Sequence, residues 1–360
     1  MSTIKHYISS ESYTTESGFT FSELPLAYHS WGELNEERDN LVLIFHALTG
    51  DSNAEEWFSG FFTDQSPIDF EREYVLCINT PGSCYGSLGP QTICPKTSQA
   101  YGTDFPLLTI RDIVAIEQRL LDHLGIQSIR CVIGGSMGGM IALEFALMDH
   151  RVQKAFLIAM GKEHTAWAIG LSHLQRNALY QDPHWCNGNY PPENPPTQGL
   201  SLARQIGMMS YRSPKNYEEK FGRSLQKSDI AKDLKHVEPS NTTKAASTPY
   251  YAVESYLNYQ GQKLVNRFDA LSYERLTRSM DTHDISRDRG TFEEVGARCS
   301  IPVKVIGINS DALYSAQEQK DLASLFPRGE YSLLDSPYGH DAFLIEFSWL
   351  IAELESFLNS

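Results

Sequence analysis

Six short apolar runs, each bounded by polar residues or glycine, indicate the buried strands of a sheet. Between them, apolar residues recur at helical spacing, most clearly over residues 110–124, where the pattern stops at Gly125. This alternation predicts an α/β fold, with a mostly parallel sheet and helices on both faces. The predicted strands are residues 40–45, 74–79, 131–133, 152–159, 301–308 and 331–334.

The beginning and the middle of the chain follow other patterns. Residues 1–37 alternate in places between apolar and polar positions, which predicts short antiparallel strands. In the middle, helical stretches replace the apolar runs, and a polar stretch at 228–249 divides them and is expected to be poorly ordered. We predict an α/β core of residues 1–160 and 300–360 with an inserted helical lid of residues 161–299. The predicted helices are residues 171–180, 199–209, 253–268 and 272–280 in the lid and 343–358 at the end.

Composition narrows the function classes. The 360 residues carry a formal net charge of -15, which argues against nucleic acid or an anionic membrane surface as the main partner. No apolar stretch approaches a membrane span and no signal-peptide core is present, so we expect a soluble, cytoplasmic protein. The six cysteines contain no C-x-x-C pair, which predicts free thiols. The eleven histidines form no H-x-H or H-E-x-x-H cluster, so we expect no metal site.

The strongest chemical signal is the sequence Gly-Gly-Ser-Met-Gly from Gly134 to Gly138. It lies between the predicted strand 131–133 and a helical pattern, which places Ser136 at a sharp turn with its hydroxyl exposed. The helix directs backbone N–H groups and the positive end of its dipole to the same point. This context favours a nucleophilic serine; the alternative is a plain glycine-rich turn.

Two polar loops near the end of the chain supply a candidate acid and base. Asp311 follows the strand 301–308, and His340 follows the strand 331–334. The chain order Ser136, Asp311, His340 is the order of α/β-hydrolases. His340 would act as general base, and Asp311 would fix the tautomer of the imidazole. Taken singly, Asp311 is a turn residue and His340 a polar loop residue, but strand, turn and order together favour a catalytic triad.

A tetrahedral oxyanion needs N–H donors beside the nucleophile. Met137 directly follows Ser136, and the polar loop after the first core strand offers Leu48. We predict that the amides of Leu48 and Met137 form the oxyanion hole. The alternative for the Leu48 loop is a simple connection between a strand and a helix.

Motifs spread over nearly the whole chain resemble the homoserine O-acetyltransferase branch of the α/β-hydrolase fold. The motifs within the lid are the most specific, because a generic esterase would share the triad but not these. The matching segments are residues 46–51 (HALTGD), 101–112 (YGTDFPLLTIRD), 134–140 (GGSMGGM), 181–185 (QDPHW), 202–204 (LAR), 210–213 (SYRS), 253–261 (VESYLNYQG) and 338–344 (YGHDAFL).

The resemblance implies a two-stage reaction with no bound cofactor and with acetyl-CoA as co-substrate. Ser136 would take the acetyl group and pass it to the hydroxyl of L-homoserine, which feeds methionine synthesis. The resemblance also implies that Arg204 faces the carboxylate of the amino acid and Asp341 its amino group, with Tyr211 as a neighbouring candidate. From the residues alone, Arg204 reads as a surface ion-pair partner and Asp341 as the N-cap of the last helix.

The resemblance further implies a homodimer formed through the lid helices. Apolar surface around Met208, Met209 and Tyr256 suits such an interface, although burial within one chain would explain these residues equally. The lid would also leave a narrow tunnel in which the acceptor outcompetes water.

Three segments depart from the family pattern, at residues 53–62, 80–90 and 313–315. They are expected near the pocket mouth, so they leave the acyl donor open. The alternatives on the same fold are homoserine O-succinyltransferase, which needs a cation for the free carboxylate of its donor, and serine O-acetyltransferase. A carboxylesterase or thioesterase is opposed by the lid motifs, and a non-catalytic binding protein by the intact triad.

Overall fold

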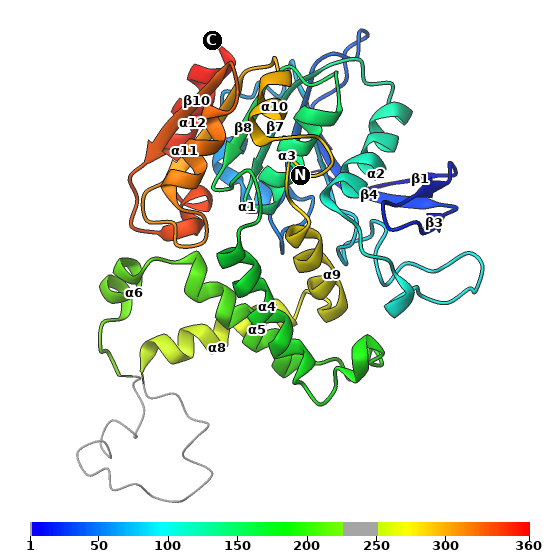
Figure 1. Ribbon diagram of the computed structural model, residues 1–360, viewed down its shortest axis with the longest axis vertical. Helices are drawn as coiled ribbons and strands as arrows, with labels where there is room; N and C mark the ends of the chain where they lie inside the picture. The colour runs from blue at the N-terminus through cyan, green and yellow to red at the C-terminus, as the bar shows by residue number, and fades with distance from the viewer. Residues whose placement is uncertain (1, 226–250) are drawn as a thin grey trace, which may run out of the picture.

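An eight-stranded sheet forms the centre of the computed structural model, which describes residues 2–225 and 251–360 (Figure 1). The polar stretch noted at residues 228–249 lies outside the described residues. Along the sheet the strands are β1 (Lys5–Ser9), β4 (Leu24–Trp31), β6 (Tyr74–Ile78), β5 (Leu41–Phe45), β7 (Ile129–Gly135), β8 (Ala155–Ile158), β9 (Val303–Ile308) and β10 (Gly329–Leu334). The strands from β6 to β10 in this order pair in parallel, which confirms the predicted parallel sheet.

The N-terminal strands extend the sheet in the antiparallel sense. Strand β1 pairs with β4, and β4 pairs with β6. Strands β2 (Tyr13–Thr14) and β3 (Thr20–Phe21) form a separate antiparallel pair. The short antiparallel strands predicted for residues 1–37 are therefore confirmed.

The sheet is covered on both faces, and β5 shows why its sequence is apolar throughout. Leu41 and Leu43 belong to one hydrophobic cluster, whereas Val42 and Ile44 belong to the other. A central strand buried on both faces requires such a continuous run. Helices α2 (Ile110–His123), α3 (Met137–Met148) and α11 (Ala316–Ser324) contribute to the first cluster, and α1 (Ala54–Trp57) and α12 (Phe347–Leu358) to the second.

The middle of the chain forms a group of helices at one end of the sheet (Figure 1). Helix α5 (Thr197–Tyr211) packs against both α4 (Ala166–Tyr180) and α8 (Ala252–Val265). Helix α9 (Ala270–Asp281) packs against α4, and α6 (Pro214–Phe221) against α8. The division into a core and a lid at residues 160 and 300 stays a prediction.

Some helices and helix boundaries differ from the prediction; α4, for example, begins at Ala166 and not at residue 171. The apolar pattern predicts neither α6 nor α11, nor α10 (Phe292–Arg298), because these helices are short and bury at most three residues each. The last helix begins at Phe347 and not at residue 343, since the 3₁₀ helix η6 (Gly339–Leu344) precedes it. No helix among the described residues is long and apolar enough to cross a membrane.

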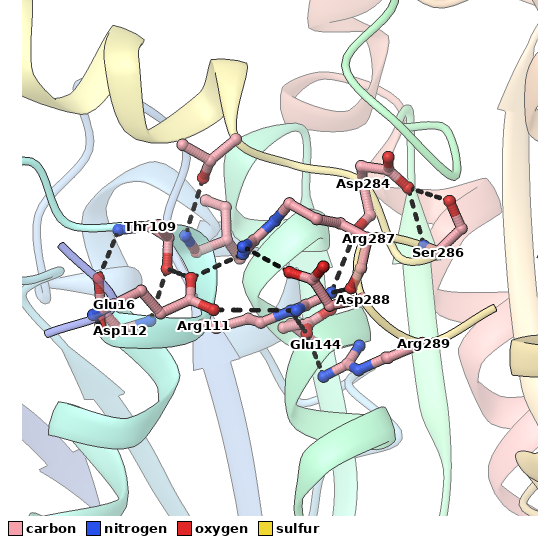
Figure 2. Close-up of polar contacts among 12 residues, drawn as sticks. Glu16, Thr109, Arg111, Asp112, Glu144, Asp284, Ser286, Arg287, Asp288 and Arg289 are labelled. Carbon is pink, nitrogen blue, oxygen red and sulfur yellow. Dashed lines mark hydrogen bonds and ion pairs between the residues drawn. The ribbon is translucent and has the colours of Figure 1, made fainter.

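A cluster of charged side chains ties the segment after α9 to helices α2 and α3 (Figure 2). Glu144 is buried in α3, where its Oε1 lies 2.9 Å from Nε of Arg111 and 2.5 Å from Nη2 of Arg289. Nη2 of Arg287 lies 2.6 Å from a carboxylate oxygen of Glu16. Nη2 of Arg111 donates to the carbonyl of Arg287 at 2.6 Å. These contacts anchor the returning chain beside the helix that begins at the nucleophile turn.

Candidate active site

Ser136 lies at the sharp turn between β7 and α3, as the sequence predicts. Its backbone angles are φ 56° and ψ -126°, a conformation that residues other than glycine rarely adopt. The N–H of Ser136 donates to the carbonyl of Ile158 at 2.9 Å, and its carbonyl accepts from the amide of Met140 at 3.1 Å. These bonds hold the turn and place the serine at the carboxyl end of the parallel strands.

Two glycines allow three backbone segments to meet at this turn. A Cβ atom on Gly134 would lie 2.2 Å from the carbonyl oxygen of Gly138. A Cβ atom on Gly138 would lie 2.2 Å from the carbonyl oxygen of Phe45. No side chain fits at either contact, so strand β7, helix α3 and strand β5 can approach this closely only with glycine at both positions.

The fold brings Asp311 and His340 together from two loops. Nδ1 of His340 donates a hydrogen bond to Oδ2 of Asp311 at 2.8 Å, and both side chains are buried. Oδ1 of Asp311 accepts from the amides of Leu313 and Tyr314 at 2.8 and 3.0 Å. Because a carboxylate only accepts, Nδ1 carries the proton and Nε2 keeps its lone pair. Nε2 is buried without a hydrogen-bond partner in the described part of the chain, and His340 lines the same pocket as Ser136.

The charges around His340 set its affinity for a proton. Burial lowers the pKa of His340, but the charge of Asp311, its hydrogen bond and the charge of Asp341 outweigh burial, so the pKa lies above its usual value. The imidazolium form is therefore stabilised in this site. A general base that must accept a proton during reaction benefits from this environment.

The loop after β5 is shaped by a buried histidine. Nε2 of His46 accepts from the amide of Thr80 at 2.9 Å, so Nδ1 carries the proton and donates to the carbonyl of Ala47 at 2.9 Å. Burial lowers the pKa of His46. Leu48 lines the pocket with Ser136, and the amides of Leu48 and Met137 donate no hydrogen bond within residues 2–225 and 251–360. Their assignment to an oxyanion hole stays a prediction.

A pocket of about 160 Å³ contains Ser136 and the three predicted substrate residues. The guanidinium carbon of Arg204 lies 5.5 Å from the centre of the Tyr211 ring. That ring centre lies 5.9 Å from the ring centre of His340. Arg204 forms no ion pair with a described residue, so nothing in that part of the chain supports its alternative interpretation as a surface ion-pair partner. The lining residues are Ala47, Leu48, Thr49, Gly50, Trp57, Ser136, Arg204, Tyr211, Arg267, His340, Asp341, Phe343 and Leu344.

Asp341 is paired with an arginine that the prediction did not include. Nε of Arg212 lies 3.0 Å from Oδ2 of Asp341. Burial raises the pKa of Asp341, while the charges of Arg212, Arg204 and His340 oppose this shift. Asp341 is therefore a carboxylate that gains from a further cation in the pocket.

The alternative interpretation of Asp341 as the N-cap of the last helix is wrong. Asp341 lies inside η6, and α12 has Glu346 as its N-cap. Phe343, within this extra turn, packs closely on Gly135, where a Cβ atom would lie 2.7 Å from its ring. That turn leaves the Asp341 side chain in the pocket instead of at a helix end.

Sequence reasoning missed two residues of the pocket. Arg267 follows α8, where a cation looks like a partner for the helix dipole. Trp57 lies within residues 53–62, a segment that is expected near the pocket mouth but in which no single residue is given a role. Of the three departing segments, only residues 53–62 supply a lining residue; neither 80–90 nor 313–315 lines the pocket. Tyr314 is fully buried there, with its ring 5.7 Å from that of His340.

The described residues contain no cluster of potential metal ligands: no three or more of their His, Cys, Asp or Glu side chains are placed together. All six cysteines are unpaired thiols.

Comparisons with known proteins bear on the fold and on the family. A family model described as the alpha/beta hydrolase fold matches residues 40–347, which confirms the predicted fold class. A homoserine O-acetyltransferase of Chlorobium chlorochromatii is 45% identical over 355 residues, covering 98% of this chain and 94% of the relative.

Solved structures show the same fold in transferases and in hydrolases. A homoserine O-acetyltransferase from Bacillus anthracis has a TM-score of 0.89 at 24% identity, covering 100% of this chain and 98% of that one. An acetylester hydrolase from Corynebacterium glutamicum has a TM-score of 0.82 at 20% identity, covering 99% of this chain and 96% of that one. The fold alone thus leaves transfer and hydrolysis open, but identity over nearly full length does not: this chain belongs to the homoserine O-acetyltransferase family of α/β-hydrolase-fold enzymes.

Proposed function

We propose that the protein transfers an acetyl group from acetyl-CoA to the hydroxyl of L-homoserine, as an enzyme of the cytoplasm. The observation that carries this proposal is a single pocket lined by Ser136, His340, Arg204 and Asp341. These four residues combine a nucleophile and its base with a cation and a carboxylate, which suits an amino acid bearing a hydroxyl. The names of the relatives support the same substrate class.

In the first half-reaction, Oγ of Ser136 attacks the thioester carbonyl while Nε2 of His340 takes the hydroxyl proton. The amides of Leu48 and Met137 hold the oxyanion. Collapse of the intermediate breaks the carbon–sulfur bond, and His340 returns the proton to the departing CoA sulfur. The product of this step is an acetyl ester on Ser136.

In the second half-reaction, the hydroxyl of L-homoserine attacks the acetyl ester and gives its proton to Nε2 of His340. The new ester bond forms as the bond to Oγ of Ser136 breaks, and the proton returns to Oγ. Arg204 binds the carboxylate of the acceptor, and Asp341 binds its ammonium group. Tyr211, whose ring lies beside both Arg204 and His340, forms the wall between them.

One observation favours succinyl transfer as a second candidate. Arg267 lines the pocket and forms no ion pair within the described part of the chain, so a cation is present for a carboxylate on the acyl group. Acetyl transfer remains the proposal because the nearly full-length relatives carry that name. Succinyl-CoA is therefore a required comparison in every assay.

The covalent step is tested by intact-mass analysis after mixing with acetyl-CoA alone. We expect one acetyl group on the protein, located at Ser136 by peptide mapping and discharged by L-homoserine but slowly by water. Ser136→Ala should carry no acetyl group. An acetyl group on another residue, or no adduct in the wild-type protein under single-turnover conditions, would contradict the mechanism.

Acceptor binding is tested with Arg204→Lys. A lysine keeps the charge but loses the bidentate geometry for a carboxylate, so we expect KM for L-homoserine to rise about tenfold or more. The rate of acetyl-enzyme formation, which does not involve the acceptor, should change far less. An unchanged KM would remove Arg204 from the acceptor site.

A further inference from the structure

Arg267 joins the lid to the loop that carries Leu48. It follows α8, and its Nη1 donates to the carbonyl of Thr49 at 2.5 Å and to the hydroxyl of Tyr85 at 2.7 Å. Its Nη2 lies 3.4 Å from Oγ1 of Thr49. Thr49 is separated from Arg267 by 218 positions, so only the folded lid brings the guanidinium here.

The Leu48 loop is therefore held from two sides. On the core side, the buried His46 donates to the carbonyl of Ala47. Within the loop, the amide of Gly50 donates to the carbonyl of Ala47 at 2.8 Å. On the lid side, Arg267 supplies the donors for the backbone carbonyl and the hydroxyl of Thr49. Leu48 lies between these two fixed points, and its amide direction depends on both.

We propose that Arg267 is a positioning residue that completes the oxyanion hole from the lid. This proposal rests on the proposed acyl transfer through Ser136. An oxyanion donor acts through its preorganised direction, so a loop that can tilt loses transition-state stabilisation without losing the donor itself. The lid thus contributes to the chemical step as well as enclosing the substrate.

The bonds of Arg267 argue for this role over a direct contact with the acyl group. Both hydrogens of Nη1 are used by Thr49 and Tyr85. A guanidinium that binds a carboxylate through two parallel bonds needs a free pair of donors, and the bonds to Thr49 and Tyr85 occupy part of that fork. A carboxylated donor would have to compete with the contacts that hold the loop.

The test compares Arg267→Ala with Arg275→Ala. Arg275 is a matched control because it is also a lid arginine that donates to core carbonyls, those of Phe105 and Thr103 at 3.1 and 3.2 Å, but it does not line the pocket. The measured rate is the pre-steady-state release of p-nitrophenol from p-nitrophenyl acetate, which reports acylation without CoA or homoserine. Urea unfolding of each variant measures stability separately.

We expect Arg267→Ala to slow acylation about tenfold to a hundredfold, less than or similar to removal of an oxyanion donor. Added guanidinium ion at sub-denaturing concentration, with an equal concentration of NaCl as control, should restore part of this rate. Arg275→Ala should acylate at the wild-type rate even if it unfolds at lower urea. Tyr85→Phe, which removes one partner of Arg267, should lie between wild type and Arg267→Ala.

Several outcomes overturn the proposal. Wild-type acylation by Arg267→Ala would show that the loop needs no lid contact, and an equal rate loss in Arg275→Ala would reduce the effect to general lid stability. Loss of succinyl but not acetyl transfer would assign Arg267 to a donor carboxylate. Ser136→Ala tests the proposed function separately. If Ser136→Ala can still be acylated, acyl transfer through Ser136 is wrong; if it cannot, a wild-type rate in Arg267→Ala contradicts only the role of Arg267.

Discussion

At the scale of single residues, the backbone of Ser136 is the clearest sign of functional constraint. Its φ of 56° places a non-glycine residue in a strained region, and such strain typically costs about 1–3 kcal/mol. A turn selected for stability alone would have glycine there. The strain is retained because only a side chain at this point can present a hydroxyl to the pocket.

This strain predicts the order of stability of two inactive variants. Ser136→Gly should have a free energy of unfolding about 1 kcal/mol above that of Ser136→Ala, because glycine adopts the turn without strain, although it gains entropy on unfolding. Urea unfolding monitored by tryptophan fluorescence measures both. A more stable alanine variant would mean that the turn carries little strain.

The pH dependence of acylation follows from the raised pKa of His340. The base must be neutral to accept the serine proton, so the rate should fall as pH drops through a midpoint above the usual 6.5. In Asp311→Asn the carboxylate charge that raises the pKa of His340 is lost. Burial, which lowers this pKa, then dominates, and only the charge of Asp341 still opposes it. The midpoint should therefore move to lower pH.

The plateau rate of Asp311→Asn should also fall, by about 10⁴-fold, because asparagine no longer fixes the tautomer of the imidazole. The p-nitrophenol burst, recorded from pH 5 to 9, measures midpoint and plateau together. An unchanged midpoint in Asp311→Asn would mean that Asp311 does not set the proton affinity of His340.

The sequence predicts the residues of the site where a linear signal exists. Ser136, Asp311 and His340 each follow a recognisable strand, so their positions at one edge of the sheet can be inferred. Arg267 has no such signal, because its partners at Thr49 and Tyr85 are set by how the lid folds back. The ion pair of Arg212 with Asp341 likewise depends on the turn of η6. The sequence pattern, which predicts a helix from residue 343, gives no sign of this turn.

At the scale of elements, helix α3 links the nucleophile to the charged cluster of Figure 2. Ser136 is the N-cap of this helix, and Glu144 lies further along it. Glu144 is only 2% exposed and has two arginine partners. A buried carboxylate is costly unless it stays paired with cations. The cluster therefore holds α3 and the segment after α9 in fixed positions.

Glu144→Gln should lower the free energy of unfolding by about 3 kcal/mol, because it removes the buried carboxylate that pairs with the partly buried guanidinium groups of Arg111 and Arg289. The matched control is Glu219→Gln, which removes the carboxylate of an exposed pair 3.9 Å from Lys215. That change should cost less than about 0.5 kcal/mol. Urea unfolding decides between them, and similar values for both variants would contradict a role of the cluster in stability.

The sequence predicts those helices and strands in which many buried apolar positions form a long periodic or continuous pattern. The apolar strands and α2 have many buried positions and could be read directly, whereas α11 buries only Gln319, Leu322 and Ala323. The predicted start of α12 is too early because the last residues of η6, Ala342 to Leu344, are apolar and continue the same pattern. Short or partly exposed helices depend on tertiary contacts that no local window contains.

At the scale of the whole molecule, the lid helices carry exposed apolar side chains. Met209 and Leu202 on α5 are 56% and 49% exposed, and Leu174 on α4 and Tyr259 on α8 are 52% and 63% exposed. Met208, by contrast, is buried within the chain. A second copy of the lid would cover this surface, which supports the predicted homodimer.

A double variant, Leu202→Asp with Met209→Asp, should convert a dimer to a monomer by placing like charges in the interface. Sedimentation velocity measures the change directly. The control is Ile93→Asp, which alters an equally exposed apolar residue (58%) outside the lid and should leave a dimer intact. A wild-type protein that sediments as a monomer would contradict the predicted assembly.

The central claim concerns what the pocket does, and free CoA release tests it most directly. The purified protein is given acetyl-CoA or succinyl-CoA, each with L-homoserine, with L-serine or with no acceptor. The account predicts sustained CoA release only with acetyl-CoA and L-homoserine together. Sustained release that ignores L-homoserine would mean that water discharges the acetyl-enzyme, and the assignment of Arg204 and Asp341 to an amino-acid acceptor would be wrong.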